Sequence, residues 1–339
     1  MTTYVHLVGS VALDTAQEVF ATAGKLLGPH LKRVPDGEPG GRRLWISWQI
    51  PLLRANPGLQ VVSRPGAEGF SLVPLRLADG VTADQLHFGE LGYAREARTS
   101  YQDFLEARAH GDLPPGVRFQ VALPTPLAVI NPFCTPEDAP KILPVYEQAM
   151  RREVGRICEA IPHADLALQW DVCIEMLMWD GRRTGPVTPD MQRELGATFA
   201  RLAAVVPEDV ELGFHLCYGD MDARHMIEPR DLGKAVELAN FIGASVKRPV
   251  TWIHMPVPIN RADDAYFQPL IRLERPPGTE LYLGLVHAAD GVLGTRRRMA
   301  TAGKYAQDFG IASECGISRG REPSVALDFL RVYAAAAAD

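Results

Sequence analysis

The feature that most constrains this chain is a repeated alternation of apolar, strand-like segments with amphipathic, helix-like segments. The pattern predicts eight strand–helix units. We expect the strands at residues 4–9, 31–35, 118–123, 165–172, 211–217, 250–255, 281–286 and 310–314. We expect the helices at residues 14–27, 42–54, 141–160, 189–206, 230–242, 264–273, 291–309 and 323–336.

Strands that alternate with helices favour parallel pairing through crossover helices. Eight units in 339 residues predict an α/β fold, a single (β/α)₈ TIM barrel over residues 1–339. A possible extra strand at residues 70–76 and a helix at residues 94–109 interrupt the regular order. They predict an insertion after the second unit.

Composition excludes several classes of protein. Hydrophobic residues make up 47% of the chain, which indicates a sizeable core. The net charge of −6 argues against a nucleic-acid partner. Neither a secretory leader nor a membrane-spanning apolar run is visible, so we expect a cytoplasmic protein with no membrane contact. Five cysteines at this length do not suggest a disulfide framework, which leaves metal binding as one use for reduced thiols.

The polar residues of interest follow the predicted strands. In a (β/α)₈ barrel the active site lies at the carboxyl ends of the strands, so these side chains should share one rim. They are Ser10, Asp36, Glu38, Asp171, His215, Cys217, His254, His287 and Cys315. Such a gathering predicts a single functional site.

Three of these residues suggest a metal centre. His215 and Cys217 stand at positions i and i+2 of one predicted strand, so their side chains share a face. Cys315 ends the last strand and could approach from another side. One imidazole and two thiolates suit Zn²⁺, and three protein ligands leave a position open for substrate. A thiol bound there would lose its proton and become a nucleophile.

Five segments resemble the catalytic, C-terminal barrel of cobalamin-independent methionine synthase, within the superfamily that includes uroporphyrinogen decarboxylase. Val8-Gly9-Ser10 resembles an Ile-Gly-Ser strand end, and Asp36-Gly37-Glu38-Pro39 resembles a His-Gly-Glu-Pro loop. Gln169-Trp170-Asp171 resembles Gln-x-Asp-Glu-Pro. His215-Leu216-Cys217-Tyr218 matches His-Met-Cys-Tyr, and Glu314-Cys315-Gly316-Ile317-Ser318-Arg319 is similar to Asp-Cys-Gly-Leu-x-x-Arg. Their order is preserved over nearly the whole chain. The N-terminal half of the full-length synthase has no counterpart.

The resemblance implies roles for particular residues. It implies zinc on His215, Cys217 and Cys315. It also implies an amino-acid-like thiol whose carboxylate is held by Ser10 and whose ammonium is held by Glu38 and Asp171.

The departures from the family pattern bear on the metal and the acid. The family's fourth zinc ligand is a Glu after the sixth strand, and His254 stands there in this chain. Val172 replaces the Glu that follows Asp171. The family's catalytic His follows the seventh strand in Asp-Ile-His, where this chain has His287-Ala288-Ala289. We therefore predict His254 as the fourth ligand, and His287 with Asp171 as catalytic groups. Asp290 and Glu175 are further candidate acids.

The leading hypothesis is a zinc-dependent transferase that moves a methyl or alkyl group to a small-molecule thiol. The donor could be a methylated corrinoid protein, a methyl-folate or a small methyl compound. One alternative is a transferase that adds a thiol to an epoxide. Others are a metal-free lyase of the uroporphyrinogen decarboxylase type and a structural zinc protein.

Overall fold

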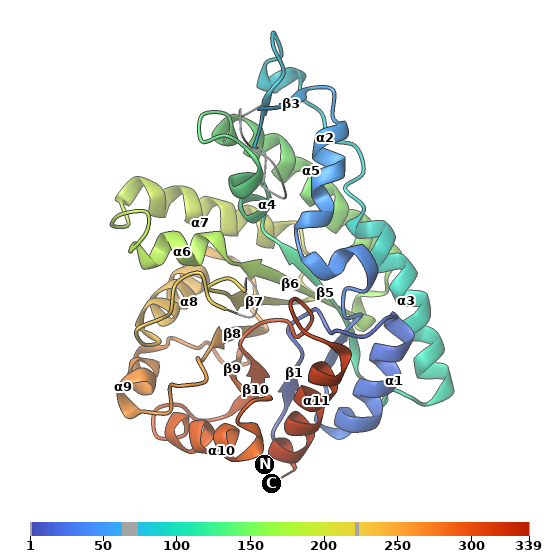
Figure 1. Cartoon of the computed structure of the whole chain (residues 1–339), viewed down its shortest axis with the longest axis vertical. Coiled ribbons are helices and arrows are strands. Elements are labelled where there is room, and N and C mark those ends of the chain that lie inside the picture. The colour runs from blue at the N-terminus through green and yellow to red at the C-terminus, as the bar shows by residue number, and fades with distance from the viewer. Residues whose placement is uncertain (1, 63–73, 221–223, 339) are drawn as a thin grey trace.

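The chain folds into a barrel of eight parallel strands, and the computed structural model describes residues 2–62, 74–220 and 224–338 (Figure 1). Parallel bridges between Val5 and Leu31 and between Ser10 and Gly37 nearly close the sheet. The strands lie in the order β1 (Val5–His6), β10 (Phe309–Ser313), β9 (Glu280–Val286), β8 (Trp252–Pro256), β7 (Glu211–Leu216), β6 (Leu166–Val172), β5 (Arg118–Pro124) and β2 (Arg33–Pro35). The predicted (β/α)₈ fold is confirmed.

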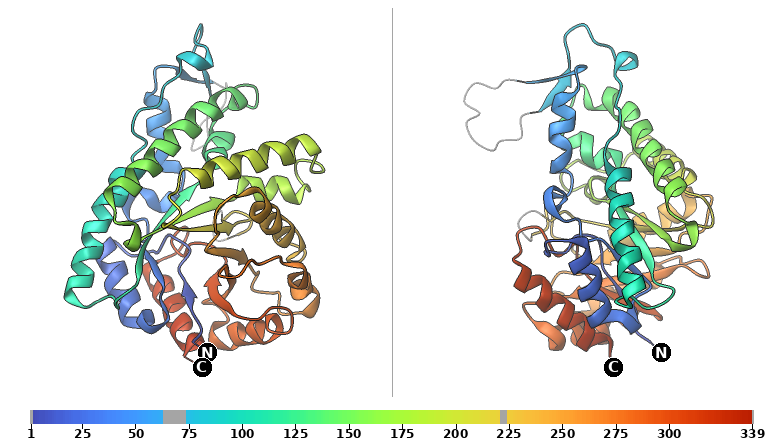
Figure 2. Two further views of the ribbon diagram at one scale, coloured as in Figure 1. Left: turned by 180° about the vertical axis from the view of Figure 1, so that it is seen from behind. Right: turned by 90° about the vertical axis from the view of Figure 1, so that its right-hand side faces the viewer.

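Helices surround the barrel on its outside (Figures 1 and 2). In α1, apolar residues recur at helical spacing and are buried, whereas the opposite face is solvated. Threonine side chains cap the first turns of α1, α4 and α7. The longer helices are α1 (Ala16–Leu27), α3 (Tyr93–His110), α5 (Ala139–Ala160), α7 (Pro189–Ala204), α8 (Gly233–Ser245), α10 (Gly291–Ala302) and α11 (Pro323–Ala337). The shorter ones are α2 (Ile50–Ala55), α4 (Pro126–Phe133), α6 (Ile174–Asp180) and α9 (Asp264–Phe267).

The insertion lies between β2 and α3 and extends away from the barrel at the top of Figure 1. It carries α2 and an antiparallel hairpin of β3 (Leu59–Val61) and β4 (Leu75–Leu77). The helix predicted at residues 42–54 forms only in part, because 3-10 turns occupy Gly40–Leu44 and Ser47–Gln49 before α2 begins. α3 is the long helix that packs against α1 and α5 in this part of the barrel. Most of the strand predicted at residues 70–76 lies outside the described residues.

Two other helices end earlier than predicted. α10 stops at Ala302, immediately before Gly303, and does not continue to residue 309. The predicted helix at residues 264–273 is split into α9 and a 3-10 segment, Gln268–Arg272, in which Pro269 lacks the amide hydrogen that an α-helix needs.

The side chains of two glutamines cross the interior of the barrel and connect strands on its opposite sides. Gln169 donates to the Val8 carbonyl at 2.7 Å, and its oxygen lies 2.9 Å from His6 Nε2. Gln120 donates to the Leu7 carbonyl at 2.9 Å. These bonds tie β5 and β6 to the β1 segment across the barrel, so the strand ends above them keep fixed positions.

Within the described ranges, none of the helices combines the length and the apolar character that crossing a lipid bilayer requires.

Candidate metal centre

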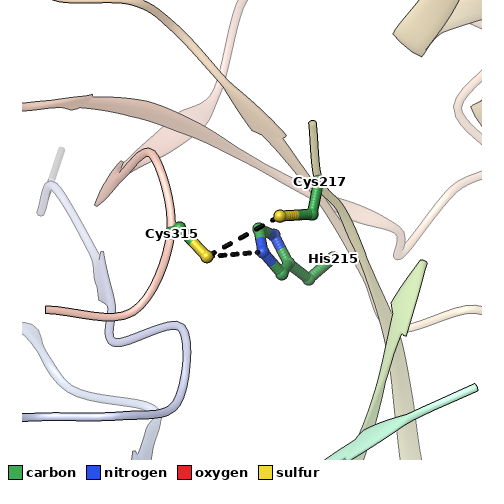
Figure 3. Close-up of side chains that lie close together, drawn as sticks. All are labelled: His215, Cys217 and Cys315. Atoms are coloured by element: carbon green, nitrogen blue, oxygen red, sulfur yellow. Dashed lines mark hydrogen bonds between the residues drawn. The ribbon is translucent and has the colours of Figure 1, made fainter. Parts of the chain in front are cut away.

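The structure brings His215, Cys217 and Cys315 together at the mouth of the barrel (Figure 3). His215 lies near the end of β7, Cys217 follows it on the same face, and Cys315 lies just beyond β10. Cys315 Sγ is 3.7 Å from Cys217 Sγ and 3.6 Å from His215 Nε2. β7 and β10 are separated by two strands in the sheet, so the curvature of the barrel makes this approach possible.

The three atoms lie within 4.8 Å of one another, and the two separations from Cys315 Sγ fit a zinc ion. A tetrahedral site with Zn–S bonds of about 2.3 Å and Zn–N bonds of about 2.0 Å needs an S···S separation of about 3.8 Å and an S···N separation of about 3.5 Å. The separations of 3.7 and 3.6 Å agree with these requirements. The residues present therefore fit the metal that the chemistry of the donor set suggests.

The three groups are neutral without a cation nearby. The Cys173 thiol and burial raise the pKa of Cys217, and the Cys217 thiol and burial raise the pKa of Cys315. Burial lowers the pKa of His215, so its imidazole is uncharged and one ring nitrogen keeps a lone pair. A dication at this point would reverse the preference of the thiols, because it stabilises thiolate.

His254, which the sequence predicts as a fourth ligand, lies beside this group of three and is not one of its members. It pairs in register with His215 on the neighbouring strand β8, so the two rings lie side by side. His254 Nδ1 is 2.6 Å from His215 Nδ1, and His254 Nε2 is 3.0 Å from the Ser313 carbonyl oxygen. The ring thus contacts the nitrogen of His215 that faces away from Cys315.

A small cavity opens beside the three candidate ligand atoms and collects the predicted substrate residues. Ser10, Glu38 and Asp171 all line it. Cys173, Trp45 and Arg319 line it as well. The sequence patterns indicate no role for Trp45 beyond packing and none for Arg319, although Arg319 belongs to the Cys315 motif.

Close approach explains the two glycines of the motifs that border the cavity. A Cβ on Gly9 would lie 2.9 Å from Glu38 Oε1, and a Cβ on Gly316 would lie 2.2 Å from Ser10 Oγ. Both positions therefore need glycine for the neighbouring polar side chain to keep its place.

The partly buried Glu38 and the buried Asp171 form an acidic pair. Burial, Asp171 and Asp36 raise the pKa of Glu38 to about 8. Burial raises the pKa of Asp171 to about 7, although Gln169 and Trp45 donate to its carboxylate at 2.9 and 3.2 Å. Glu38 also has a backbone φ of 53°, in the left-handed region, and its amide donates to Asp36 Oδ1 at 2.9 Å. Near neutral pH the pair can hold a proton and release it when a cation arrives.

Arg319 supplies positive charge in the same cavity. Its guanidinium lies over the Trp45 ring at 5.6 Å from the centroid. Its buried Nε has no hydrogen-bond partner among the described residues. The cavity is therefore lined by one guanidinium group, three carboxyl groups and three thiols.

The predicted acid His287 lies apart from the lining of this cavity. Its Nε2 donates to the Val257 carbonyl at 2.9 Å, and burial lowers its pKa to about 4. Its Nδ1 is 3.8 Å from Glu314 Oε2, and Glu314 is the residue before Cys315. Burial raises the pKa of Glu314 to about 8. Within the described part of the chain, His287 thus approaches the candidate metal centre through Glu314.

The two other candidate acids occupy different environments. Asp290 pairs with the buried Arg298 at 2.6 Å, which explains its lowered pKa. Glu175 is fully buried at the start of α6, and burial raises its pKa to about 7. Neither residue lines the cavity beside the cysteines.

Comparisons with known proteins support the fold. No family model and no curated protein matches the sequence. A solved structure from Listeria monocytogenes, assigned as a vitamin-B12 independent methionine synthase, matches with a TM-score of 0.62 at 14% identity, covering 100% of this chain and 98% of that chain. A B12-independent methionine synthase from Shewanella sp. W3-18-1, in complex with selenomethionine, matches with a TM-score of 0.49 at 14% identity, covering 78% of this chain and 68% of that chain. The Listeria match shows that this chain has a methionine-synthase-like barrel.

Proposed function

We propose that this protein is a zinc-dependent transferase that activates a small thiol and moves a methyl or alkyl group onto its sulfur. One observation carries the proposal: His215 Nε2, Cys217 Sγ and Cys315 Sγ converge at the spacing of a tetrahedral zinc site. Three protein atoms leave one position for a substrate atom, which favours a catalytic site over a closed structural one.

Zinc held by these residues would supply the charge that turns a substrate thiol into a thiolate at neutral pH, where a free thiol is mostly protonated. Two cysteines rather than more histidines suit this task, because their negative charge leaves the bound sulfur electron-rich enough to attack. The adjoining cavity places Ser10, Glu38 and Asp171 beside them.

The charges in the cavity favour an amino-acid-like thiol. In the proposal, Glu38 and Asp171 bind its ammonium group, and Ser10 and Arg319 face its carboxylate. Because the pKa values of Glu38 and Asp171 are raised to about 8 and 7, an arriving ammonium would displace a proton from the pair. That proton would then be available beside the reacting sulfur.

Asp171 and His287 remain the proposed proton-handling groups. Asp171 lines the cavity and can hold a proton near neutral pH. His287 would act through Glu314, which is 3.8 Å from it and adjacent to Cys315. A leaving alkoxide or amine of the donor requires such a proton. The proposed donors remain a methylated corrinoid protein, a methyl-folate, a small methyl compound or an epoxide.

Metal analysis followed by thiol titration tests the proposal. The purified protein should contain one zinc per chain, and the Cys217→Ser variant should lose it. X-ray absorption at the zinc edge should show one additional sulfur ligand when a small amino thiol is added. A protein that binds no zinc, or whose zinc keeps the same ligands at saturating thiol, would contradict the proposal.

A further inference from the structure

A chain of hydrogen bonds leads from the backbone of β10 to the proposed zinc ligand on β7. The Ser313 carbonyl oxygen is 3.0 Å from His254 Nε2. On the other side of the same ring, His254 Nδ1 is 2.6 Å from His215 Nδ1. The remaining nitrogen, His215 Nε2, faces Cys315 Sγ at 3.6 Å. Both rings are buried, as is Ser313.

The first group in the chain fixes the position of every hydrogen after it. A carbonyl oxygen only accepts, so His254 must carry its hydrogen on Nε2. In a neutral imidazole the other nitrogen then has no hydrogen, so His254 Nδ1 accepts. His215 must therefore donate from Nδ1, which leaves its Nε2 with a free lone pair pointed at the cysteines.

Both rings are buried, and a pair of neutral rings satisfies every contact in the chain. Neither ring has an ion-pair partner among the described residues, whereas His163, His225 and His287 elsewhere each lie near a carboxylate. A charged ring at this place would have no anion to offset its desolvation.

We propose that His254 is a positioning residue, which sets His215 in the tautomer that presents a bare Nε2 to the metal, and is not itself a ligand. A metal-bound histidine usually donates its second ring nitrogen to a carboxylate or a backbone carbonyl. Here the His254 ring lies between His215 and the Ser313 carbonyl, so the carbonyl sets the tautomer of His215 through His254. The fourth place at the metal is then free of protein atoms.

This inference rests on the proposed function for the identity of the metal, but the hydrogen positions can be measured without any metal. In metal-free protein carrying ¹⁵N-labelled histidine, long-range ¹H–¹⁵N correlation should show His215 protonated on Nδ1 and His254 protonated on Nε2. A His215 ring protonated on Nε2 would overturn the proposal. This result does not depend on whether the protein binds zinc or alkylates a thiol.

Two substitutions test the consequence for the metal. In His254→Gln, one amide can donate to the Ser313 carbonyl and accept from His215 Nδ1, so zinc affinity should stay within a few-fold of the native value. In His254→Leu both bonds are lost, and zinc affinity measured by chelator competition should fall about 10- to 100-fold. Equal affinities in native protein and the Leu variant, or equal losses in both variants, would overturn the proposal.

The zinc ligand shell separates the positioning role from direct ligation. X-ray absorption should find one imidazole and two sulfurs from the protein in both native and His254→Gln enzymes. A second imidazole in the native enzyme would overturn the proposal. If the Leu variant fails to fold, the Gln variant and the histidine spectra of native protein still decide. If native protein binds no zinc, the proposed function fails and the spectra alone test the tautomer.

Discussion

The two ends of this barrel both hold clusters of polar side chains. They differ in whether the carboxyl groups of the cluster form ion pairs. At the amino ends of the strands, Arg33 binds Glu211 and Glu280, and Lys32 binds Glu280 at 2.6 Å. Burial alone would raise the pKa of Glu280, yet Arg33 and Lys32 lower it below its usual value. At the carboxyl ends, Glu38 and Asp171 have raised pKa values.

The difference indicates a division of roles. The charged groups at the amino ends are already bound to one another in ion pairs, so they are not free to bind a ligand. At the other end, Glu38 and Asp171 form no ion pair with any described residue, and this costs stability unless a cation or a substrate arrives. In a (β/α)₈ barrel the carboxyl end is also where catalysis takes place. Substitutions at the two ends should therefore give opposite patterns of effect.

The largest effect should follow loss of a proposed zinc ligand. Apparent zinc-binding free energies of about 10–16 kcal/mol shared among four ligands correspond to roughly 3–4 kcal/mol for each. Cys315→Ser should therefore weaken zinc binding about 100- to 1,000-fold, measured by chelator competition. Cys158→Ser, at a buried thiol in α5, is the matched control and should keep full zinc content. Equal zinc affinities in the two variants would show that zinc does not bind at the carboxyl end.

The next largest effect should appear at the amino end, in stability alone. Arg33→Met leaves Glu211 and Glu280 without their buried partner. Because these carboxylates are about a quarter exposed, we expect a loss of about 3 kcal/mol, at the lower limit for a broken buried pair. Urea denaturation measures it.

The control for this substitution is Arg331→Met. Arg331 pairs with Asp328, and both side chains are more than half exposed, so the loss should be at most about 1 kcal/mol. The zinc affinity of Arg33→Met should equal that of native protein. A lowered zinc affinity would show that the two ends are coupled and that the division of roles is wrong.

A smaller effect should link pH to stability at the carboxyl end. The folded pKa of Glu38 is about 8, above its unfolded value, so the folded state holds this proton more tightly. The full shift corresponds to about 5 kcal/mol, and solvent screens part of it because Glu38 is only partly buried, so stability should fall by about 2 kcal/mol as pH rises from about 4.5 to 8. Denaturation of metal-free protein at several pH values should show a shallower decline in Glu38→Gln. Glu237→Gln, on the half-exposed surface of α8, should keep the native slope. Parallel slopes in all three proteins would mean that Glu38 is not held protonated.

Sequence patterns were sufficient for much of the carboxyl end. Alternate residues of a strand share a face, so the sequence alone places His215 and Cys217 together. Eight strand–helix units then place Cys315 on the same rim. The contact of His254 with His215 could not be predicted, because the end of a strand fixes the rim but not which neighbour a ring contacts. Only the register of β7 with β8 shows that His254 lies against His215.

The insertion limited prediction for a different reason. Gly40 and Trp45 adopt positive φ values of 66° and 55°, which an α-helix does not allow, so residues 42–54 could not form one helix. These turns place the Trp45 indole beside Asp171, although the two residues are far apart in sequence. The pattern of neighbouring residues in the sequence does not predict a contact between residues so far apart.

Trp45 therefore gives the smallest but most specific test of the contrast between the two ends. Its Nε1 donates to Asp171 at 3.2 Å, so Trp45→Phe removes one bond to a carboxylate that the proposal assigns to substrate ammonium. A single hydrogen bond contributes about 1 kcal/mol, so amino-thiol affinity measured by calorimetry should change about fivefold. Trp48→Phe makes the same change in the same insertion, where the ring packs on Tyr93, and should leave thiol affinity unchanged. If both variants bind the thiol alike, Asp171 does not contact the ammonium, and the acidic pair does not have the proposed role in substrate binding.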